Sequence, residues 1–216
     1  MRIRGAVLRA MGAQPPYAVS RPLSIEQVDL APPGNGEVLV KIHAVGLCHS
    51  DLSVINGDRS RPMPMLLGHE AAGVVEEPGE GVSDLKKGDH VVMVFVPSCG
   101  HCQPCAEGRP ALCEPGAVAN TAGTLLSGLR RLRQPDGVRE LNHHLGCSAF
   151  AEYATVSRRS LVRIDPELPL DEAALFGCAV LTGVGAVINT AGVRAGQNVA
   201  VIGLGGVGLS SVLGAV

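Results

Sequence analysis

Short segments in which apolar and polar residues alternate make up most of the chain up to about residue 161. Clear examples are residues 37–46 (EVLVKIHAVG), 73–82 (GVVEEPGEGV) and 90–96 (HVVMVFV), which are separated by turn-rich sequences such as PPGNG and KKGDH. Alternation with a period of two residues is typical of β-strands that have one buried face. We therefore expect this part of the chain to be mostly β-structure.

The pattern changes after Ser160. Residues 171–192 start with acidic residues and are rich in Ala and Leu, which predicts helices. The apolar run VAVI at 199–202 precedes a glycine cluster and the sequence GLSSVLGAV, and this order predicts a strand, a tight turn and a helix. We expect a domain boundary near residue 170. Residues 199–216 carry no charge and have the length of a membrane span, but their central glycines favour the strand–turn–helix interpretation.

Residues 121–147 have the least regular pattern of the chain. We expect a loop that passes over the surface. His143 and His144 in this loop are expected to face solvent, because no cluster of possible partners lies near them in the sequence.

The composition excludes several classes of partner. The 216 residues are 46% hydrophobic and carry a formal net charge of -2, and they include no Trp, two Tyr and three Phe. A chain without a basic bias and with few aromatic residues is poorly suited to nucleic acid or to membrane lipid. Arginines interrupt the apolar residues of the N-terminal MRIRGAVLRA, so no secretory leader is visible. We expect a soluble cytoplasmic protein with reduced thiols.

Four cysteines occur close together at the spacing C-x2-C-x2-C-x7-C: Cys99, Cys102, Cys105 and Cys113. Four thiolates suit zinc or an iron–sulfur cluster and leave no open coordination position. In the bacterial ferredoxin run the fourth cysteine follows after three residues and precedes Pro, whereas here seven residues intervene and Glu114 follows, which favours zinc. The alternative is two disulfides or four unrelated thiols. The Pro- and Gly-rich surroundings predict a lobe of turns over residues 97–115.

A second group of possible metal ligands is dispersed along the chain. Cys48 lies in GLCHSD, His69 in GHEAAG and Cys178 in LFGCAVLTG. Two thiolates and one imidazole would leave one position of a tetrahedral zinc ion open for chemistry. The alternative is that both cysteines are small buried apolar residues and that His69 is satisfied within a core.

Five motifs together resemble the zinc-dependent medium-chain alcohol dehydrogenase family: GLCHSD, GHEAAGVVE, CGHCQPC, GCAVLTGVGA and GLGGVG. The resemblance implies a fold between α+β and α/β, with a mostly β GroES-like catalytic domain over residues 1–170 and the start of a doubly wound Rossmann domain over 171–216. It also implies two zinc ions per chain, one catalytic on Cys48, His69 and Cys178 and one structural on the four clustered cysteines. The implied reaction interconverts an alcohol and an aldehyde or ketone by hydride transfer to NAD or NADP.

The resemblance assigns further roles near the catalytic ion. Asp51 and Glu70 match carboxylates that support the metal ligands. Ser50 matches the hydroxyl that accepts the proton of the alcohol. The histidine that usually ends this proton relay falls at Ser53, which is no base near neutral pH, so another group or water must take the proton. Phe95 matches an apolar residue that walls the alcohol pocket, although core packing explains it equally well.

Cofactor contacts are also implied. His49 matches a residue on the cofactor pyrophosphate, and Thr182 matches one near the nicotinamide. The glycine-rich turn allows close approach of backbone to pyrophosphate at a helix N-terminus, and its glycines are Gly203, Gly205, Gly206 and Gly208.

The acidic residue that would bind the adenine ribose is expected about 20 residues beyond this motif, past Val216, so the sequence does not separate NAD from NADP. We expect a chain truncated within its cofactor domain, because such domains need on the order of 100 residues. The intact enzyme is expected to be a homo-oligomer, an expectation that does not extend to this chain. The alternatives are a non-catalytic zinc-binding remnant and a zinc-free quinone reductase.

Overall fold

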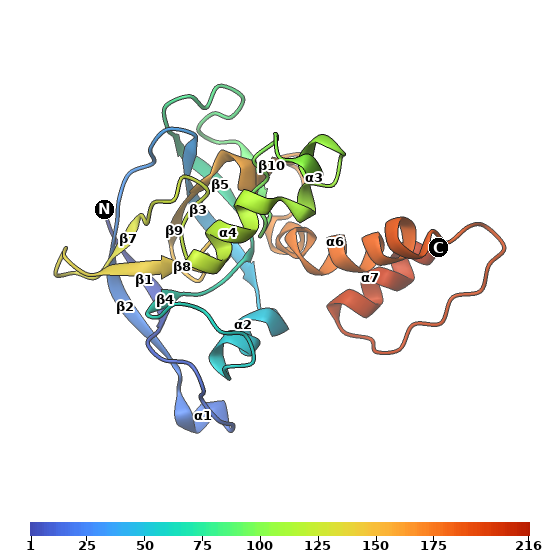
Figure 1. Ribbon diagram of the computed structural model, residues 1–216, viewed down its shortest axis with the longest axis horizontal. Coiled ribbons are helices and arrows are strands. Elements are labelled where there is room, and N and C mark those ends of the chain that lie inside the picture. Colours follow the sequence, from blue (N-terminus) through green and yellow to red (C-terminus); the bar gives the residue numbers. More distant parts are fainter.

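Two β-sheets form the body of the molecule in the computed structural model, which describes residues 1–216, and a pair of helices extends from it toward the C-terminus (Figure 1). One sheet closes into a barrel in the order β1 (Arg2–Leu8), β2 (Leu23–Leu30), β7 (Leu132–Arg133), β8 (Glu140–His143) and β4 (Met65–Leu66). The other has the order β10 (Leu161–Arg163), β6 (His90–Met93), β5 (Glu70–Pro78), β3 (Glu37–Gly46) and β9 (Tyr153–Ser157).

The strands predicted from alternation are confirmed. Residues 37–46 form β3, and the segments 73–82 and 90–96 contribute to β5 and β6. The inner faces of β3, β5, β6 and β9 share one core that includes Val40, Val75 and Met93, and a second core that includes Val7 and Leu66 fills the barrel. This burial of apolar side chains holds the sheets in register.

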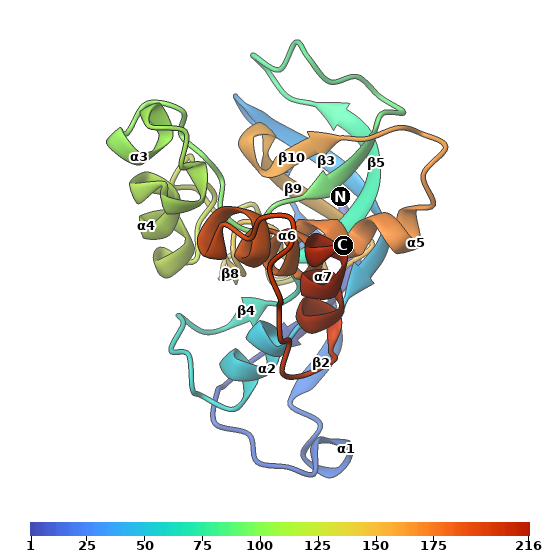
Figure 2. The ribbon, with the colours of Figure 1, turned by 90° about the vertical axis from the view of Figure 1, so that its right-hand side faces the viewer.

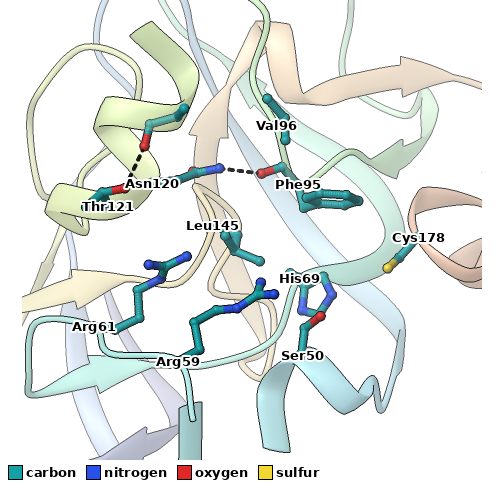
Figure 3. A pocket seen from close by; sticks show the side chains of 11 residues that line it. Ser50, Arg59, Arg61, His69, Phe95, Val96, Asn120, Thr121, Leu145 and Cys178 are labelled. Atoms are coloured by element: carbon teal, nitrogen blue, oxygen red, sulfur yellow. Dashed lines mark hydrogen bonds between the residues drawn. The ribbon is translucent and has the colours of Figure 1, made fainter. Parts of the chain in front are cut away.

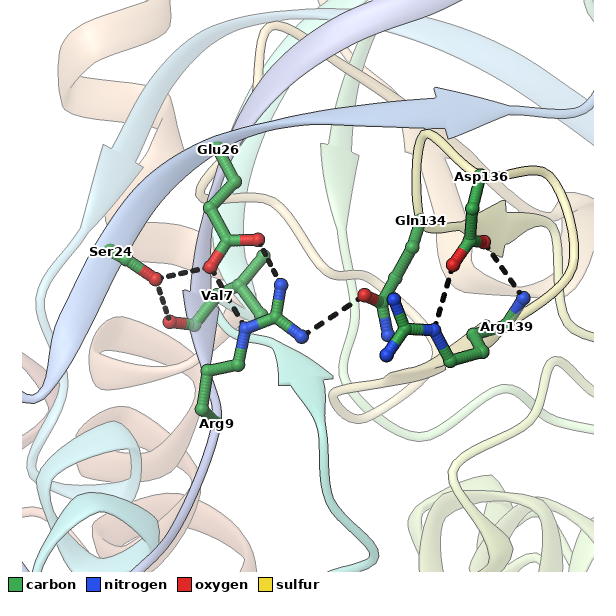
Figure 4. A network of polar contacts seen from close by, with 7 residues as sticks. All are labelled: Val7, Arg9, Ser24, Glu26, Gln134, Asp136 and Arg139. Carbon is green, nitrogen blue, oxygen red and sulfur yellow. Dashed lines mark hydrogen bonds and ion pairs between the residues drawn. The ribbon is translucent and has the colours of Figure 1, made fainter.

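A polar network joins the barrel strands at the surface (Figure 4). Arg9 directly follows β1, and its Nε donates to Glu26 Oε1 of β2 at 3.1 Å while its Nη1 donates to Gln134 Oε1 at 3.2 Å. Beyond β7, Arg139 Nε donates to Asp136 Oδ2 at 2.7 Å. These contacts tie the ends of three strands together on the polar side of the barrel.

Short helices occupy the connections and the C-terminal part. They are α1 (Tyr17–Ser20), α2 (His49–Ile55), α3 (Gln103–Ala106), η1 (Pro110–Leu112), α4 (Glu114–Ala122), η2 (Arg158–Ser160), α5 (Leu170–Ala173), η3 (Ala174–Gly177), α6 (Ala179–Gly185), η4 (Ala186–Ala191) and α7 (Gly206–Ala215). Figure 2 shows α6 and α7 side by side. Gly183 makes this packing possible, because a Cβ there would lie 2.3 Å from the Val207 carbonyl oxygen.

Two sequence expectations about secondary structure are wrong. The stretch 121–147 is not a surface loop, because β7 and β8 close the barrel there and both His143 and His144 are buried. Residues 199–202 do not form a strand, although the following helix α7 is present. A parallel strand obtains its backbone hydrogen bonds from neighbouring strands, and this segment has no such neighbour and leaves Ile202 fully exposed.

Membrane-spanning length is not reached by any single apolar helix. Only Leu170–Gly177 and Ala179–Ala191 together pass the criteria of length and hydropathy, and they are bent by 53° relative to each other.

Candidate active site

Cys48, His69 and Cys178 meet at the junction between the sheets and the C-terminal helices. Cys48 directly precedes α2, His69 lies between β4 and β5, and Cys178 separates η3 from α6. Their possible ligand atoms all lie within 4.8 Å of one another, and the two sulfur atoms are 3.8 Å apart. Two sulfur ligands at about 2.3 Å from one tetrahedral ion are separated by about 3.8 Å, so the spacing of this donor set fits zinc.

The electrostatics of this group favour a bound cation. The Cys178 thiol and the His69 imidazole lower the pKa of Cys48 to about 3, so this sulfur is a thiolate at neutral pH. Burial disfavours a charged His69, but Asp51 and Cys48 outweigh it and raise the pKa of His69 to about 9. The neighbouring Cys48 thiolate raises the pKa of Cys178. A site that holds anionic sulfur beside a buried carboxylate attracts positive charge.

Asp51 organises the ligands from the first turn of α2. Its Oδ1 lies 3.2 Å from His69 Nδ1 and 3.1 Å from His144 Nδ1, and it accepts a hydrogen bond from the Gly68 backbone. Its Oδ2 accepts from the Cys48 backbone N–H at 3.2 Å. Because Nδ1 of His69 faces a carboxylate, Nε2 is the ring nitrogen left for a metal. Burial disfavours a charged Asp51, but the two imidazoles outweigh it and lower the pKa of this carboxyl group.

His144 is a site residue that the sequence analysis missed. The chain buries it completely, with its ring centroid 5.3 Å from that of His69. Neither ring nitrogen has a hydrogen bond of good geometry, although Nδ1 lies close to Asp51. The sequence offers only a histidine directly after β8 as a signal. Its burial depends on the pairing of β8 with β4, which lies far away in the sequence.

Glu70 and Gly177 fix the position of the Cys178 thiol. The Glu70 carboxylate is 3% exposed, and its Oε1 accepts a hydrogen bond from the Ala179 backbone at 2.9 Å. Burial raises the pKa of Glu70. A Cβ at position 177 would lie 2.1 Å from the Met93 carbonyl oxygen, so only glycine lets η3 pack this closely on the end of β6. Glu70 thus supports a ligand of the site through the backbone.

A cavity of about 230 Å³ opens beside these ligands (Figure 3). Ser50, His69 and Cys178 lie on one side of it, and Phe95 and Leu145 supply apolar walls. The Phe95 ring meets the His69 ring edge-on with centroids 5.9 Å apart. The position of Phe95 in the wall agrees with the pocket role that the resemblance implied.

The expected cofactor residues lie on the C-terminal helices and at the start of α2. His49 is the exposed first residue of α2, Ser53 is in its third to last position, and Thr182 is exposed on α6. In the glycine turn, Gly203 has a φ of 97°, and a Cβ at Gly208 would lie 1.9 Å from its carbonyl oxygen. Gly205 precedes α7 and Gly206 begins it. Positions 203 and 208 of the turn therefore favour glycine, the first for its positive φ and the second for lack of space.

The four clustered cysteines form a second group of possible metal ligands. Their sulfur atoms lie within 4.8 Å of one another, and no cysteine of the chain forms a disulfide. Cys113 Sγ accepts hydrogen bonds from the backbone of Cys99 at 3.1 Å and of Gly116 at 3.4 Å. Backbone N–H groups, that of His101 foremost, lower the pKa of Cys99 to about 6. This four-sulfur set also fits zinc.

A family profile described as "Alcohol dehydrogenase GroES-like domain" matches residues 34–166. The chain belongs to this alcohol dehydrogenase family. The S-(hydroxymethyl)glutathione dehydrogenase of Escherichia coli O1:K1 is 45% identical to this chain over 207 residues, which cover 92% of the chain and 54% of the relative. The chain spans about half the length of the curated relatives that it matches.

Solved structures agree on the fold of this family member. An alcohol dehydrogenase zinc-binding domain protein from Burkholderia ambifaria has a TM-score of 0.90 at 40% identity, covering all of this chain and 56% of its own. The benzyl alcohol dehydrogenase of Acinetobacter calcoaceticus has a TM-score of 0.87 at 33% identity, covering all of this chain and 55% of its own. The expected GroES-like fold class is thereby confirmed.

Proposed function

We propose that the protein is a zinc-dependent oxidoreductase that interconverts an alcohol and an aldehyde or ketone, with NAD or NADP as the hydride carrier. The observation that supports this most is the open set of Cys48, His69 and Cys178 beside a cavity, with a sulfur spacing of 3.8 Å. In the oxidation direction, the alcohol gives a hydride to the oxidised nicotinamide and a proton to the protein.

The metal-site residues would divide the chemistry as follows. Cys48, His69 and Cys178 hold the catalytic zinc, and zinc bound there supplies a Lewis acid that favours loss of the hydroxyl proton of the substrate. Asp51 keeps His69 in the tautomer with the proton on Nδ1. Glu70 holds the Cys178 segment through the Ala179 backbone.

Proton transfer would begin at Ser50, which lines the cavity beside His69. Its hydroxyl can accept the proton of the alcohol while it passes its own proton on. Ser53 does not end such a relay, so another group or water takes the proton from Ser50. Phe95 and Leu145 limit the access of water to the reacting carbon.

The domain arrangement belongs to the same proposal. Residues 1–170 form the GroES-like catalytic domain, in which the lobe at 97–115 is ordered by a structural zinc on its four cysteines. Residues 171–216 supply the first part of a dinucleotide-binding domain, with His49 and Thr182 directed to the cofactor. The glycine turn before α7 presents backbone N–H groups to the pyrophosphate. We also propose a cytoplasmic location.

A non-catalytic zinc-binding protein is the second candidate. The observation in its favour is that both groups of possible zinc ligands are complete without any contribution from the cofactor segment after residue 178. Such a protein would bind zinc and would not turn over.

Metal analysis and turnover on the purified chain test the proposal together. We expect two zinc ions per chain; the proposed function predicts alcohol-dependent reduction of NAD or NADP, for which little or no turnover is expected unless the rest of the cofactor domain is present. Cys48→Ser should lose one zinc ion and the turnover, whereas Cys147→Ala, at a buried cysteine outside both sulfur groups, should keep both. Two bound zinc ions without turnover would favour the non-catalytic candidate, and absence of zinc would favour a zinc-free reductase.

A further inference from the structure

Two arginines enter the cavity beside the proposed zinc ligands. Arg59 and Arg61 follow α2, and Figure 3 shows both guanidinium groups extending into the cavity, that of Arg59 toward His69 and Ser50 and that of Arg61 toward Asn120 and Thr121. No acidic residue is among the residues that line this cavity. The lining of the cavity therefore carries positive charge and no negative charge.

Neither guanidinium group has a carboxylate partner within the chain. Arg131, in contrast, pairs with the buried Glu37 at 2.6 Å. The Arg59 side chain makes no hydrogen bond in the structure. Arg61 makes one, from Nη1 to the Ser60 carbonyl oxygen at 3.2 Å, and its Nε is buried without a partner. A buried donor without a partner is uncommon in folded proteins and indicates a missing acceptor.

Two acids of the same segment, Asp51 and Asp58, already have other hydrogen-bond partners. The Asp58 carboxylate accepts from Asn56 Nδ2 at 2.7 Å, and the Asp58 backbone N–H donates to Asn56 Oδ1 at 3.0 Å. Asp51 is surrounded by its imidazole and backbone donors. Burial and, after it, the charge of Arg59 lower the pKa of Arg61.

We propose that this cavity takes an alcohol or aldehyde that carries a carboxylate at the end remote from its reacting carbon, with Arg59 and Arg61 as the carboxylate subsite. The planar guanidinium group offers parallel N–H donors that match the two oxygens of a carboxylate. The apolar surface of Phe95 and Leu145 suits the hydrocarbon part of such a molecule. The inference rests on the proposed function, because it places the reacting end at the zinc ligands.

Matched ligands test the subsite directly. ω-Hydroxy acids of increasing chain length and their methyl esters are titrated into the zinc-loaded chain by isothermal titration calorimetry. The esters keep the hydroxyl group and the hydrocarbon chain but lack the charge. At the best length we expect the acid to bind at least about tenfold more tightly than its ester, since charge-assisted hydrogen bonds contribute about 1.5–3 kcal/mol. Equal binding of acid and ester, or no binding of either, would overturn the inference.

Variants assign the charge to the two arginines. Arg59→Gln combined with Arg61→Gln should bring the affinity for the acid down to that for the ester. Arg194→Gln, at an exposed arginine of the C-terminal segment, should keep the preference. Circular dichroism and zinc content check the fold of each variant. A preference for the acid that survives the double substitution would overturn the assignment.

Turnover separates this inference from the proposed function. Oxidation of neutral alcohols without any preference for the acids would leave the proposed function standing and overturn the subsite. Tighter binding of the acids without turnover of any alcohol would do the reverse.

Discussion

The substitution Asp51→Asn should both destabilise the fold and weaken the metal site. Asp51 is 4% exposed; its oxygens accept hydrogen bonds from the backbone of Gly68 and Cys48, and its Oδ1 lies 3.2 Å from the His69 ring and 3.1 Å from the His144 ring. An asparagine keeps one acceptor and turns an NH2 group toward donors on the other side. Hydrogen bonds to a charged group contribute about 1.5–3 kcal/mol each, so disruption of two gives a loss of about 3–6 kcal/mol in the free energy of unfolding.

Two measurements check this value. Urea unfolding of the metal-free protein gives the change in stability, and competition with a chromophoric chelator gives the zinc affinity of the Cys48, His69 and Cys178 site. We expect a zinc affinity about 10–100-fold lower, because partners that orient a metal-binding imidazole have effects of this size. The control is Asp58→Asn at an exposed acid nearby, which should stay within about 0.5 kcal/mol. An Asp51→Asn protein with wild-type stability and zinc affinity would refute the reasoning.

Three further substitutions test other parts of the structure. Cys113→Ser should remove one zinc ion per chain and increase proteolysis within residues 97–115, and retention of two ions in metal analysis would contradict the structural site. Burial lowers the pKa of His143 to about 3, so between about pH 3 and 6.5 the unfolded chain binds a proton at His143 that the folded chain does not. The free energy of unfolding should therefore fall as the pH drops below about 6.5, by about 2 kcal/mol at pH 5. Urea unfolding measured against pH should show that His143→Gln lacks this loss. Gly183→Ala should lower the free energy of unfolding by about 1–3 kcal/mol, because its Cβ would clash with the Val207 carbonyl oxygen. Gly185→Ala is the control and should not lower it, because the nearest contact of its Cβ is at 3.8 Å. Equal melting temperatures of the two variants would disprove the tight contact between α6 and α7.

The sequence predicted the local features of the fold and both sulfur groups. Alternation found β3, β5 and β6 because their periodicity is carried by adjacent residues, and the cysteine spacing found the lobe for the same reason. Prediction from the sequence failed for features that depend on contacts between segments far apart in the chain. The short strands β7 and β8 have no alternation of their own and exist only through pairing with β2 and β4, so the burial of His143 and His144 was not visible.

The remaining errors have the same origin. Residues 199–202 have the composition of a strand, but a strand needs a neighbour that composition does not supply. Arg59 and Arg61 belong to no motif, and only the folded cavity shows that they face the proposed ligands without a counter-charge. The identities of Asp51 and Glu70 as supporting groups came from resemblance, while their partners, His144 and the Ala179 backbone, came from the structure.

Because Gly177 has no side chain, the Cys178 thiol can lie close to the end of β6. Even one methyl group at position 177 would clash with the Met93 carbonyl oxygen there. Gly177 therefore sets the distance between β6 and the Cys178 sulfur. Bulk introduced there would displace the sulfur of Cys178 from its companions, and the defect would register as weakened metal uptake rather than as ordinary misfolding.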